Sequence, residues 1–246
     1  MGISAEERKI IRSILDQNEQ DATQMLGQVM DNPVTKYTDP EQLQQEMDIL
    51  FRNFPIVIAH SSELADVGDF LTHDDTGVPL LVTRSEQGDI KAFLNVCRHR
   101  GARIEGEPCG HARRFTCPYH AWTYGLDGGL RGMPQPVGFD SVDRSEHGLV
   151  ELPAFERFGL IWVVPSPQDG AVDLDAWLAP MEEQFDGLDL GSHVVFRKWA
   201  LHKNMSWRLA LEGFQESYHF CSAHRHTACS NYLENQSLFL NYEPHV

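Results

Sequence analysis

Long apolar runs, basic residues and cysteines are all scarce in this chain of 246 residues. The longest apolar stretches, 54–59 and 159–164, are far shorter than the roughly 20 residues that a membrane-spanning helix needs. Asp and Glu outnumber Lys and Arg by 36 to 20, which gives a net charge of −16. A charge of this sign disfavours nucleic acid and anionic membrane surfaces as partners. We therefore expect a protein that binds neither nucleic acid nor membrane.

The beginning of the chain also lacks the apolar region of a signal peptide, because it turns polar within the first few residues. We therefore predict a cytoplasmic location, where disulfides are rare. The sequence has five cysteines, and three of them, Cys109, Cys221 and Cys229, are interpreted as free thiols. A hydrophobic content of 41% with 10% aromatic residues suits a globular core, in one large or two small domains.

Two short Cys/His pairs dominate what the sequence does contain. Cys97 and His99 form the first pair, and Cys117 and His120 form the second. Structural zinc sites usually draw two Cys from one loop and two His from the other. One Cys and one His in each loop fits a [2Fe–2S] centre of the Rieske type better, since there two Cys hold one iron and two His hold the other. A zinc site, or core residues without a metal, are the alternatives.

The residues around these pairs resemble the Rieske domain of ring-hydroxylating oxygenase α subunits. The resemblance is carried by CRHRGA at 97–102, by CPYHAWTY at 117–124, and by the approach GDIKAFLNV at 88–96. It extends from about Tyr37 to His224 and implies that both Cys/His pairs bind the cluster. Gly101 and Pro118 favour tight loops, or fingers, around the ligands.

Several arginines lie close to the two pairs in this otherwise acidic chain. One hypothesis is that they favour the reduced cluster or dock an acidic electron donor. The alternative is that they are solvated or paired with structural carboxylates. The residues concerned are Arg98, Arg100, Arg103, Arg113 and Arg114.

A second motif lies near the end of the sequence and contains Glu216, His219 and His224. Mononuclear non-haem Fe(II) sites use two His and one carboxylate. Glu216 and His219 are neighbours on a helix surface, whereas His219 and His224 would point about 140° apart on a straight helix. We therefore expect the helix to end or distort between Phe220 and Ala223.

This motif resembles the catalytic motif of the same oxygenase family. The resemblance implies that His219 and His224 bind iron. It also implies that Glu216 is a catalytic residue, which links the iron site to a Rieske histidine of a neighbouring subunit. In the family the third, carboxylate ligand comes from a helix far downstream, and neither Glu234 nor Glu243 takes its place. We therefore interpret the chain as a C-terminally truncated α subunit.

An α+β fold in three parts is expected. Residues 1–50 would form N-terminal helices, residues 51–165 a small all-β Rieske domain with two cluster-binding fingers, and residues 166–246 an incomplete helix-grip catalytic domain. Helices are predicted at 1–31, from Pro40 with Asp39 as N-cap, at 174–181 and at 207–219. Strands are predicted at 78–83, 90–96, 114–116, 149–152, 159–164 and 194–201.

The resemblance implies the terminal oxygenase component of a multicomponent Rieske non-haem iron oxygenase. It would take electrons from an NAD(P)H-dependent reductase, with or without a ferredoxin, and assemble as a homotrimer or α3β3. The [2Fe–2S] cluster would pass electrons to a mononuclear Fe(II) that activates O2 to hydroxylate an aromatic or similar small organic substrate. One alternative is oxidative demethylation of a quaternary ammonium compound, and another is a Rieske-type electron carrier without catalysis.

Overall fold

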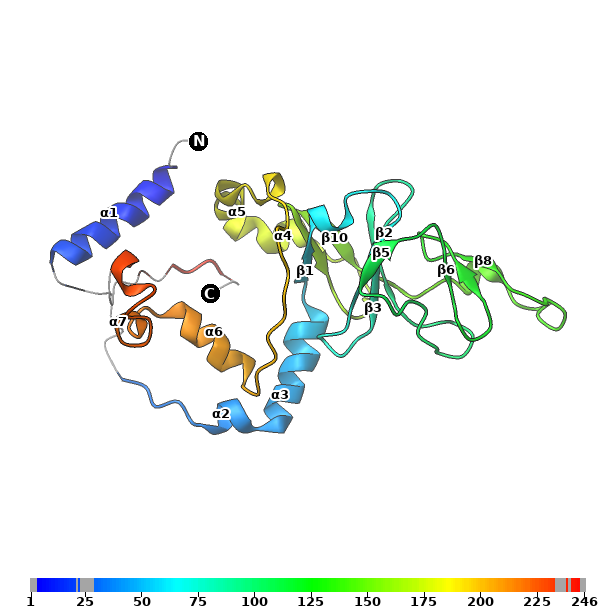
Figure 1. The fold of residues 1–246 in the computed structure, drawn as a ribbon, viewed down its shortest axis with the longest axis horizontal. Coiled ribbons are helices and arrows are strands. Elements are labelled where there is room, and N and C mark those ends of the chain that lie inside the picture. Colours follow the sequence, from blue (N-terminus) through cyan, green and yellow to red (C-terminus); the bar gives the residue numbers. More distant parts are fainter. Residues whose placement is uncertain (1–3, 21, 23–28, 233–237, 239, 244–246) are drawn as a thin grey trace. The chain divides into compact units, whose positions relative to one another are not determined.

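The computed structural model describes residues 4–20, 22, 29–232, 238 and 240–243. The chain divides into two compact units (Figure 1). One unit comprises residues 44–199, and the other comprises residues 1–43 together with 200–246. Among the described residues, no helix has the length and apolar character needed to cross a membrane.

The unit of residues 44–199 is built on three antiparallel sheets. The five-stranded sheet has the order β5 (Cys109–His111), β2 (Asp69–His73), β3 (Leu80–Arg84), β4 (Ile90–Leu94) and β9 (Glu151–Leu152). A three-stranded sheet has the order β1 (Ile56–His60), β11 (Leu160–Val163) and β10 (Ala154–Arg157). A second three-stranded sheet has the order β6 (Phe115–Thr116), β7 (Thr123–Tyr124) and β8 (Leu130–Gly132).

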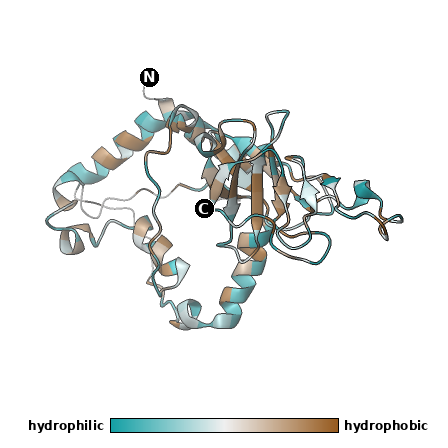
Figure 2. Ribbon diagram, turned by 45° about the vertical axis from the view of Figure 1, so that its right-hand side comes forward, coloured by the Kyte–Doolittle hydropathy of each residue, from teal (hydrophilic) through white to brown (hydrophobic). Residues whose placement is uncertain are grey.

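The hairpin of β3 and β4 separates two hydrophobic cores. Successive strand residues point to opposite faces, so Leu81 and Phe93 belong to one core while Leu80, Val82 and Ala92 belong to the other. Both faces of β3 are therefore covered, and its apolar residues are fully buried. The core of Leu81 and Phe93 also contains the two finger cysteines. Figure 2 shows the hydrophobic residues concentrated on the strands of this unit.

Short helices that follow the last strand pack onto the same unit. They are α4 (Leu174–Leu178), the 3₁₀ turn η4 (Ala179–Met181) and α5 (Glu182–Leu188). Leu174 and Leu178 are buried against Trp162 of β11, with Phe185 alongside. The helix predicted at 174–181 is confirmed, although its last turn is 3₁₀. The predicted domain boundary after residue 165 stays a prediction.

One predicted strand is wrong. Residues 193–203 have no regular secondary structure, although the sequence pattern favours a strand at 194–201. The Val195 N–H donates to the Ser62 hydroxyl at 3.1 Å, and Lys198 pairs with Glu63 at 2.8 Å. A strand would need backbone hydrogen bonds to a neighbouring strand, whereas this segment is held by contacts with side chains. Phe196 is 98% exposed. The other five predicted strands correspond to β3, β4, β6, β9 and β11.

The regular elements in the described part of the second unit are mainly helical. They include α1 (Ala5–Glu19), α2 (Thr35–Thr38), α6 (Trp207–Gln215), α7 (Phe220–Ala223) and the 3₁₀ turn η6 (Cys229–Asn231). The helix predicted at 1–31 is shorter, because α1 ends at Glu19 and residues 29–34 are not helical; residues 21 and 23–28 lie outside the described part. The Tyr37 hydroxyl donates to Glu212 at 2.7 Å and so joins α2 to α6.

Helix α3 (Pro40–Glu46) runs from one unit into the other and continues as the π-helical turn η1 (Met47–Phe51). It begins at Pro40 as predicted. The Asp39 carboxylate accepts the Glu41 N–H at 2.9 Å, which satisfies one of the free donors at the helix start.

Candidate metal centres

The two fingers have the same backbone hydrogen-bond pattern. In the first, the Cys97 N–H donates to Ala102 at 2.8 Å and the Gly101 N–H donates to Cys97 at 2.9 Å. In the second, the Cys117 N–H donates to Trp122 at 2.8 Å and the Ala121 N–H donates to Cys117 at 3.0 Å. The fifth residue of each turn has a positive φ, +72° at Gly101 and +54° at Ala121. Each finger is therefore a tight local turn that begins at its cysteine.

The histidines of the two fingers meet. The ring centroids of His99 and His120 lie 4.6 Å apart. His99 also stacks on Trp122, with centroids 5.0 Å apart and planes within 7°, and meets the edge of Phe139. Tyr119 lies against His120 at 3.8 Å. Aromatic side chains thus fix both imidazoles.

The two cysteine thiols are buried beside Tyr124 in the core that lies against β3 and β4. The Tyr124 hydroxyl lies 3.3 Å from the Cys97 sulfur and accepts the Arg98 N–H at 3.1 Å. Burial and the hydrogen bond with Cys97 raise the pKa of Tyr124 well above its ordinary value. The hydroxyl therefore keeps its proton and can donate to a thiolate. Sequence reasoning assigned Tyr124 no role; this residue ends β7, two positions after Trp122, and both side chains are buried in the same core.

The base of the first finger is braced by a buried side-chain amide. Asn95 is fully buried. Its NH₂ group donates to the Glu105 carbonyl at 2.8 Å, and its oxygen accepts the N–H groups of Ile104 and Glu105 at 3.3 and 3.0 Å. Asn95 thus ties the end of the segment that enters the finger to the segment that leaves it.

The donor set fits a [2Fe–2S] cluster. The Nδ1 atom of His99 is buried, with no hydrogen-bond partner among the residues that the structure describes. A buried polar atom of this kind needs a partner, and a metal ion would supply one. Burial, with the nearby His120 and Arg100, lowers the pKa of His99. This lowering favours the neutral imidazole, which is the form that binds metals.

The arrangement favours a cluster over a single zinc ion. Zinc draws its four ligands around a single point, whereas a Rieske cluster distributes two Cys and two His over two irons. Two buried thiols and two adjacent imidazoles meet the second requirement.

The arginines near the fingers do not act as one group. Arg103 forms a two-pronged pair with Asp74, at 2.9 and 2.7 Å, which supports a structural role for this residue. Arg113 and Arg114 line a pocket of about 250 Å³ together with Arg131. Arg98 and Arg100 are exposed on the first finger itself.

The second motif does not lie on one helix, which corrects the helix predicted at 207–219. Helix α6 ends at Gln215, and Glu216 is extended, with φ −128° and ψ 148°. His219 then precedes the single turn α7, and His224 follows it. The break therefore comes earlier than expected, before His219, and α7 ends just before His224.

This geometry brings the two histidines together. Their ring centroids lie 5.3 Å apart. The Glu216 carboxylate is hydrogen-bonded to Nδ1 of His219 and accepts its backbone N–H at 3.2 Å. The bond with His219 lowers the pKa of Glu216. A carboxylate on one imidazole nitrogen leaves the other nitrogen available to a metal. Two of the three expected iron ligands are thus adjacent, while Glu234 lies outside the described residues.

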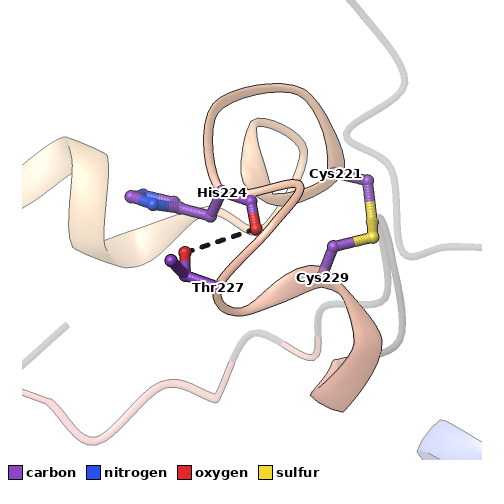
Figure 3. The surroundings of a disulfide bond; sticks show 4 residues. All are labelled: Cys221, His224, Thr227 and Cys229. Atoms are coloured by element: carbon purple, nitrogen blue, oxygen red, sulfur yellow. Dashed lines mark hydrogen bonds between the residues drawn. A yellow bond between two sulfur atoms is a disulfide. The ribbon is translucent and has the colours of Figure 1, made fainter.

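Cys221 and Cys229 form a disulfide, so their interpretation as free thiols is wrong (Figure 3). The turn between α7 and η6 brings their Cα atoms to 4.8 Å, within the range that a disulfide requires. Cys109 has a free thiol, exposed on β5.

Comparison with known proteins agrees with the finger geometry. Residues 54–153 match the family model of the Rieske [2Fe-2S] domain. This range contains both fingers and all three sheets except the last strands, β10 and β11.

The similarity extends beyond that domain. The chain is 34% identical to the oxygenase subunit of a glycine betaine monooxygenase from Chromohalobacter salexigens over 78% of its length, and 30% identical to the α subunit of a biphenyl 2,3-dioxygenase from Rhodococcus jostii over 80%. It spans 42% of each of these relatives. A quaternary ammonium Rieske monooxygenase solved with gamma-butyrobetaine superposes with a TM-score of 0.73 at 27% identity, covering 78% of this chain and 56% of that one. The chain therefore contains a Rieske [2Fe–2S] domain, and it is homologous to Rieske oxygenase α subunits over about 80% of its length.

Proposed function

We propose that this chain acts in the terminal oxygenase component of a Rieske non-haem iron oxygenase, which hydroxylates a small organic molecule with O2. The observation that carries the proposal is the presence, in one chain, of the two fingers and of the Glu216, His219 and His224 group. A Rieske-type electron carrier needs only the fingers, so a carrier function would leave Glu216, His219 and His224 without a role.

The fingers provide the electron-transfer site. When bound, the cluster supplies one-electron transfer at a potential raised by its two imidazole ligands. Trp122 stacks on the first of these imidazoles and keeps its orientation, and the Tyr124 hydroxyl, 3.3 Å from the Cys97 sulfur, can donate to the thiolate that Cys97 would supply. The proposed cluster ligands are Cys97, His99, Cys117 and His120.

His219 and His224 are the proposed protein ligands of a mononuclear Fe(II), which when bound is the place where O2 is activated. Glu216 orients His219 through Nδ1. A carboxylate oxygen has two lone pairs, so Glu216 can also accept a hydrogen bond from a finger histidine of a neighbouring subunit. Glu216 would then connect the two centres across a subunit contact in a homotrimer or α3β3 assembly.

Electrons would come from an NAD(P)H-dependent reductase, with or without a ferredoxin. Two substrate classes follow from the relatives. The 30% identity to a biphenyl dioxygenase supports an aromatic or similar small organic substrate. The 34% identity to a glycine betaine monooxygenase supports a quaternary ammonium compound as the second candidate. Product analysis with one substrate of each class distinguishes them.

The variant Glu216→Gln tests the connecting role. It preserves size but removes the charge that accepts hydrogen bonds from both imidazoles. We expect the cluster iron and the mononuclear iron to be retained, while product formation coupled to NAD(P)H oxidation falls about 100-fold, the upper range for groups that orient metal ligands. The matched control is Glu243→Gln, an exposed glutamate of the same unit, which should leave turnover unchanged. Full coupled turnover in Glu216→Gln contradicts the role.

A further inference from the structure

The disulfide of Cys221 and Cys229 closes a loop that contains His224 (Figure 3). Eight positions separate the two cysteines in sequence. Cys221 lies within α7, and Cys229 begins η6. Both cysteines are partly buried, whereas His224 is exposed. The covalent link therefore encloses one of the two proposed iron ligands.

The backbone of His224 is the centre of hydrogen bonding in this loop. Its carbonyl accepts the N–H groups of Thr227, Ala228 and Cys229 at 3.1, 3.0 and 3.2 Å, and the Thr227 hydroxyl at 3.4 Å. Figure 3 shows the last of these bonds beside the disulfide. Because one carbonyl accepts several hydrogen bonds, the direction of the chain after His224 is fixed. The third donor belongs to the disulfide-bonded Cys229 itself.

The near side of the loop is tied to the other histidine. The Ala223 N–H donates to the His219 carbonyl at 2.7 Å, and the His224 N–H donates to Phe220 at 2.8 Å. Helix α7 has only four residues, and a helix of this length is not stable by itself. The disulfide joins this short turn to η6 and so holds the spacing between the two imidazoles.

We propose that the Cys221–Cys229 disulfide is a positioning element for His224, and that metal binding by His219 and His224 therefore depends on the thiol redox state. The inference rests on the proposed function, which assigns the metal to these two histidines. A dithiol reductant would supply two electrons and two protons. The S–S bond would break, both cysteines would become thiols, and the dithiol would close to its own disulfide. The loop would then lose its covalent closure, and His224 its fixed position.

The test uses the full 246-residue chain with its cluster in place, and Co(II) as the added metal. The double variant Cys221→Ser/Cys229→Ser removes the link and is compared with Cys109→Ser, which removes an exposed free thiol elsewhere. We expect the dissociation constant for Co(II) to rise about 10- to 100-fold in the double variant, the range for groups that orient a metal ligand. The control should match the unmodified chain. Thiol labelling with mass spectrometry should find the two cysteines linked before treatment with a dithiol and labelled after it.

A second measurement reports on the loop without any metal. Hydrogen exchange at the amides of Thr227, Ala228 and Cys229 should accelerate in the double variant and on reduction, because these N–H groups bond to the His224 carbonyl. Unchanged exchange, or two freely labelled thiols in the untreated chain, overturns the inference.

The variant His219→Ala/His224→Ala distinguishes a failure of the proposed iron site from a failure of the proposed role of the disulfide. If Co(II) binding does not depend on these histidines, the proposed iron site fails and the inference fails with it. If binding requires the histidines but is equally tight in the double serine variant, the inference alone fails.

Discussion

Replacing Tyr124 by Phe should lower the reduction potential of the cluster. The Tyr124 hydroxyl lies 3.3 Å from the Cys97 sulfur, and it accepts the Arg98 N–H at 3.1 Å, so its own proton is directed elsewhere. Burial and the bond with Cys97 raise the pKa of Tyr124, which favours the protonated hydroxyl as the donor. Removal of this donor takes away a hydrogen bond that favours the more negative, reduced state.

The expected size follows from the strength of such a bond. A hydrogen bond to a charged group contributes about 1.5–3 kcal/mol, and only the difference between the two oxidation states shifts the potential. A difference of about 1 kcal/mol corresponds to about 40 mV, because 59 mV is a tenfold change for one electron. We therefore expect Tyr124→Phe to shift the potential by about −40 mV with the cluster content unchanged.

The assay is an optical redox titration of the cluster-loaded chain. Tyr119→Phe is the matched control, since Tyr119 is on the second finger but is 60% exposed, and its potential should stay at that of the unmodified protein. A potential of Tyr124→Phe equal to that of the control, or more positive, refutes the reasoning.

Two further predictions concern the scaffold of the cluster domain. Arg84 forms a two-pronged pair with Glu156, at 2.6 and 3.0 Å, and its hydrogen bond holds the pKa of Glu156 below the ordinary range. Glu156→Gln should therefore lower the free energy of unfolding by about 1 kcal/mol above pH 5. This loss should vanish as the pH falls through the pKa of Glu156 in the folded protein, because the carboxylate is then protonated in both states. Urea unfolding at several pH values measures the loss, and a loss that does not change with pH contradicts the prediction. A Cβ at Gly128, where φ is +75°, would lie 2.4 Å from a ring carbon of Phe93, whereas at Gly88, with φ +87°, it would meet nothing within 4 Å. Gly88→Ala should cost about 1 kcal/mol and Gly128→Ala about 2–4 kcal/mol in the same assay, and equal costs would contradict the proposed clash.

The fingers could be predicted from the sequence because each is a local structure. Cysteine, histidine and the turn residues of a finger lie within six positions, so their spacing already contains most of the geometry. Even so, the equivalence of Gly101 and Ala121 is not visible in the residue types, since an alanine rarely takes a positive φ. It follows from the backbone hydrogen bonds that the two turns share.

Three predictions from the sequence were wrong: a strand, the end of a helix and the state of two cysteines. A strand at 194–201 has the right apolar pattern, but a strand also requires a neighbouring strand, and this segment instead bonds to the side chains of Ser62 and Glu63. The end of α6 at Gln215 carries no proline or glycine signal directly after it, so the helix was expected to reach His219. The disulfide depends on the three-dimensional approach of Cys221 and Cys229, about which the expected compartment says nothing.

The most direct test of the account is the content and ligation of the metal centre in the isolated chain. We predict two irons and two acid-labile sulfides per chain, with pulsed EPR of the reduced protein showing magnetic coupling to two histidine nitrogens. One of these couplings should disappear in His99→Cys and the other in His120→Cys. A single zinc ion without sulfide, or an iron–sulfur cluster without nitrogen coupling, would contradict the assignment of the two fingers.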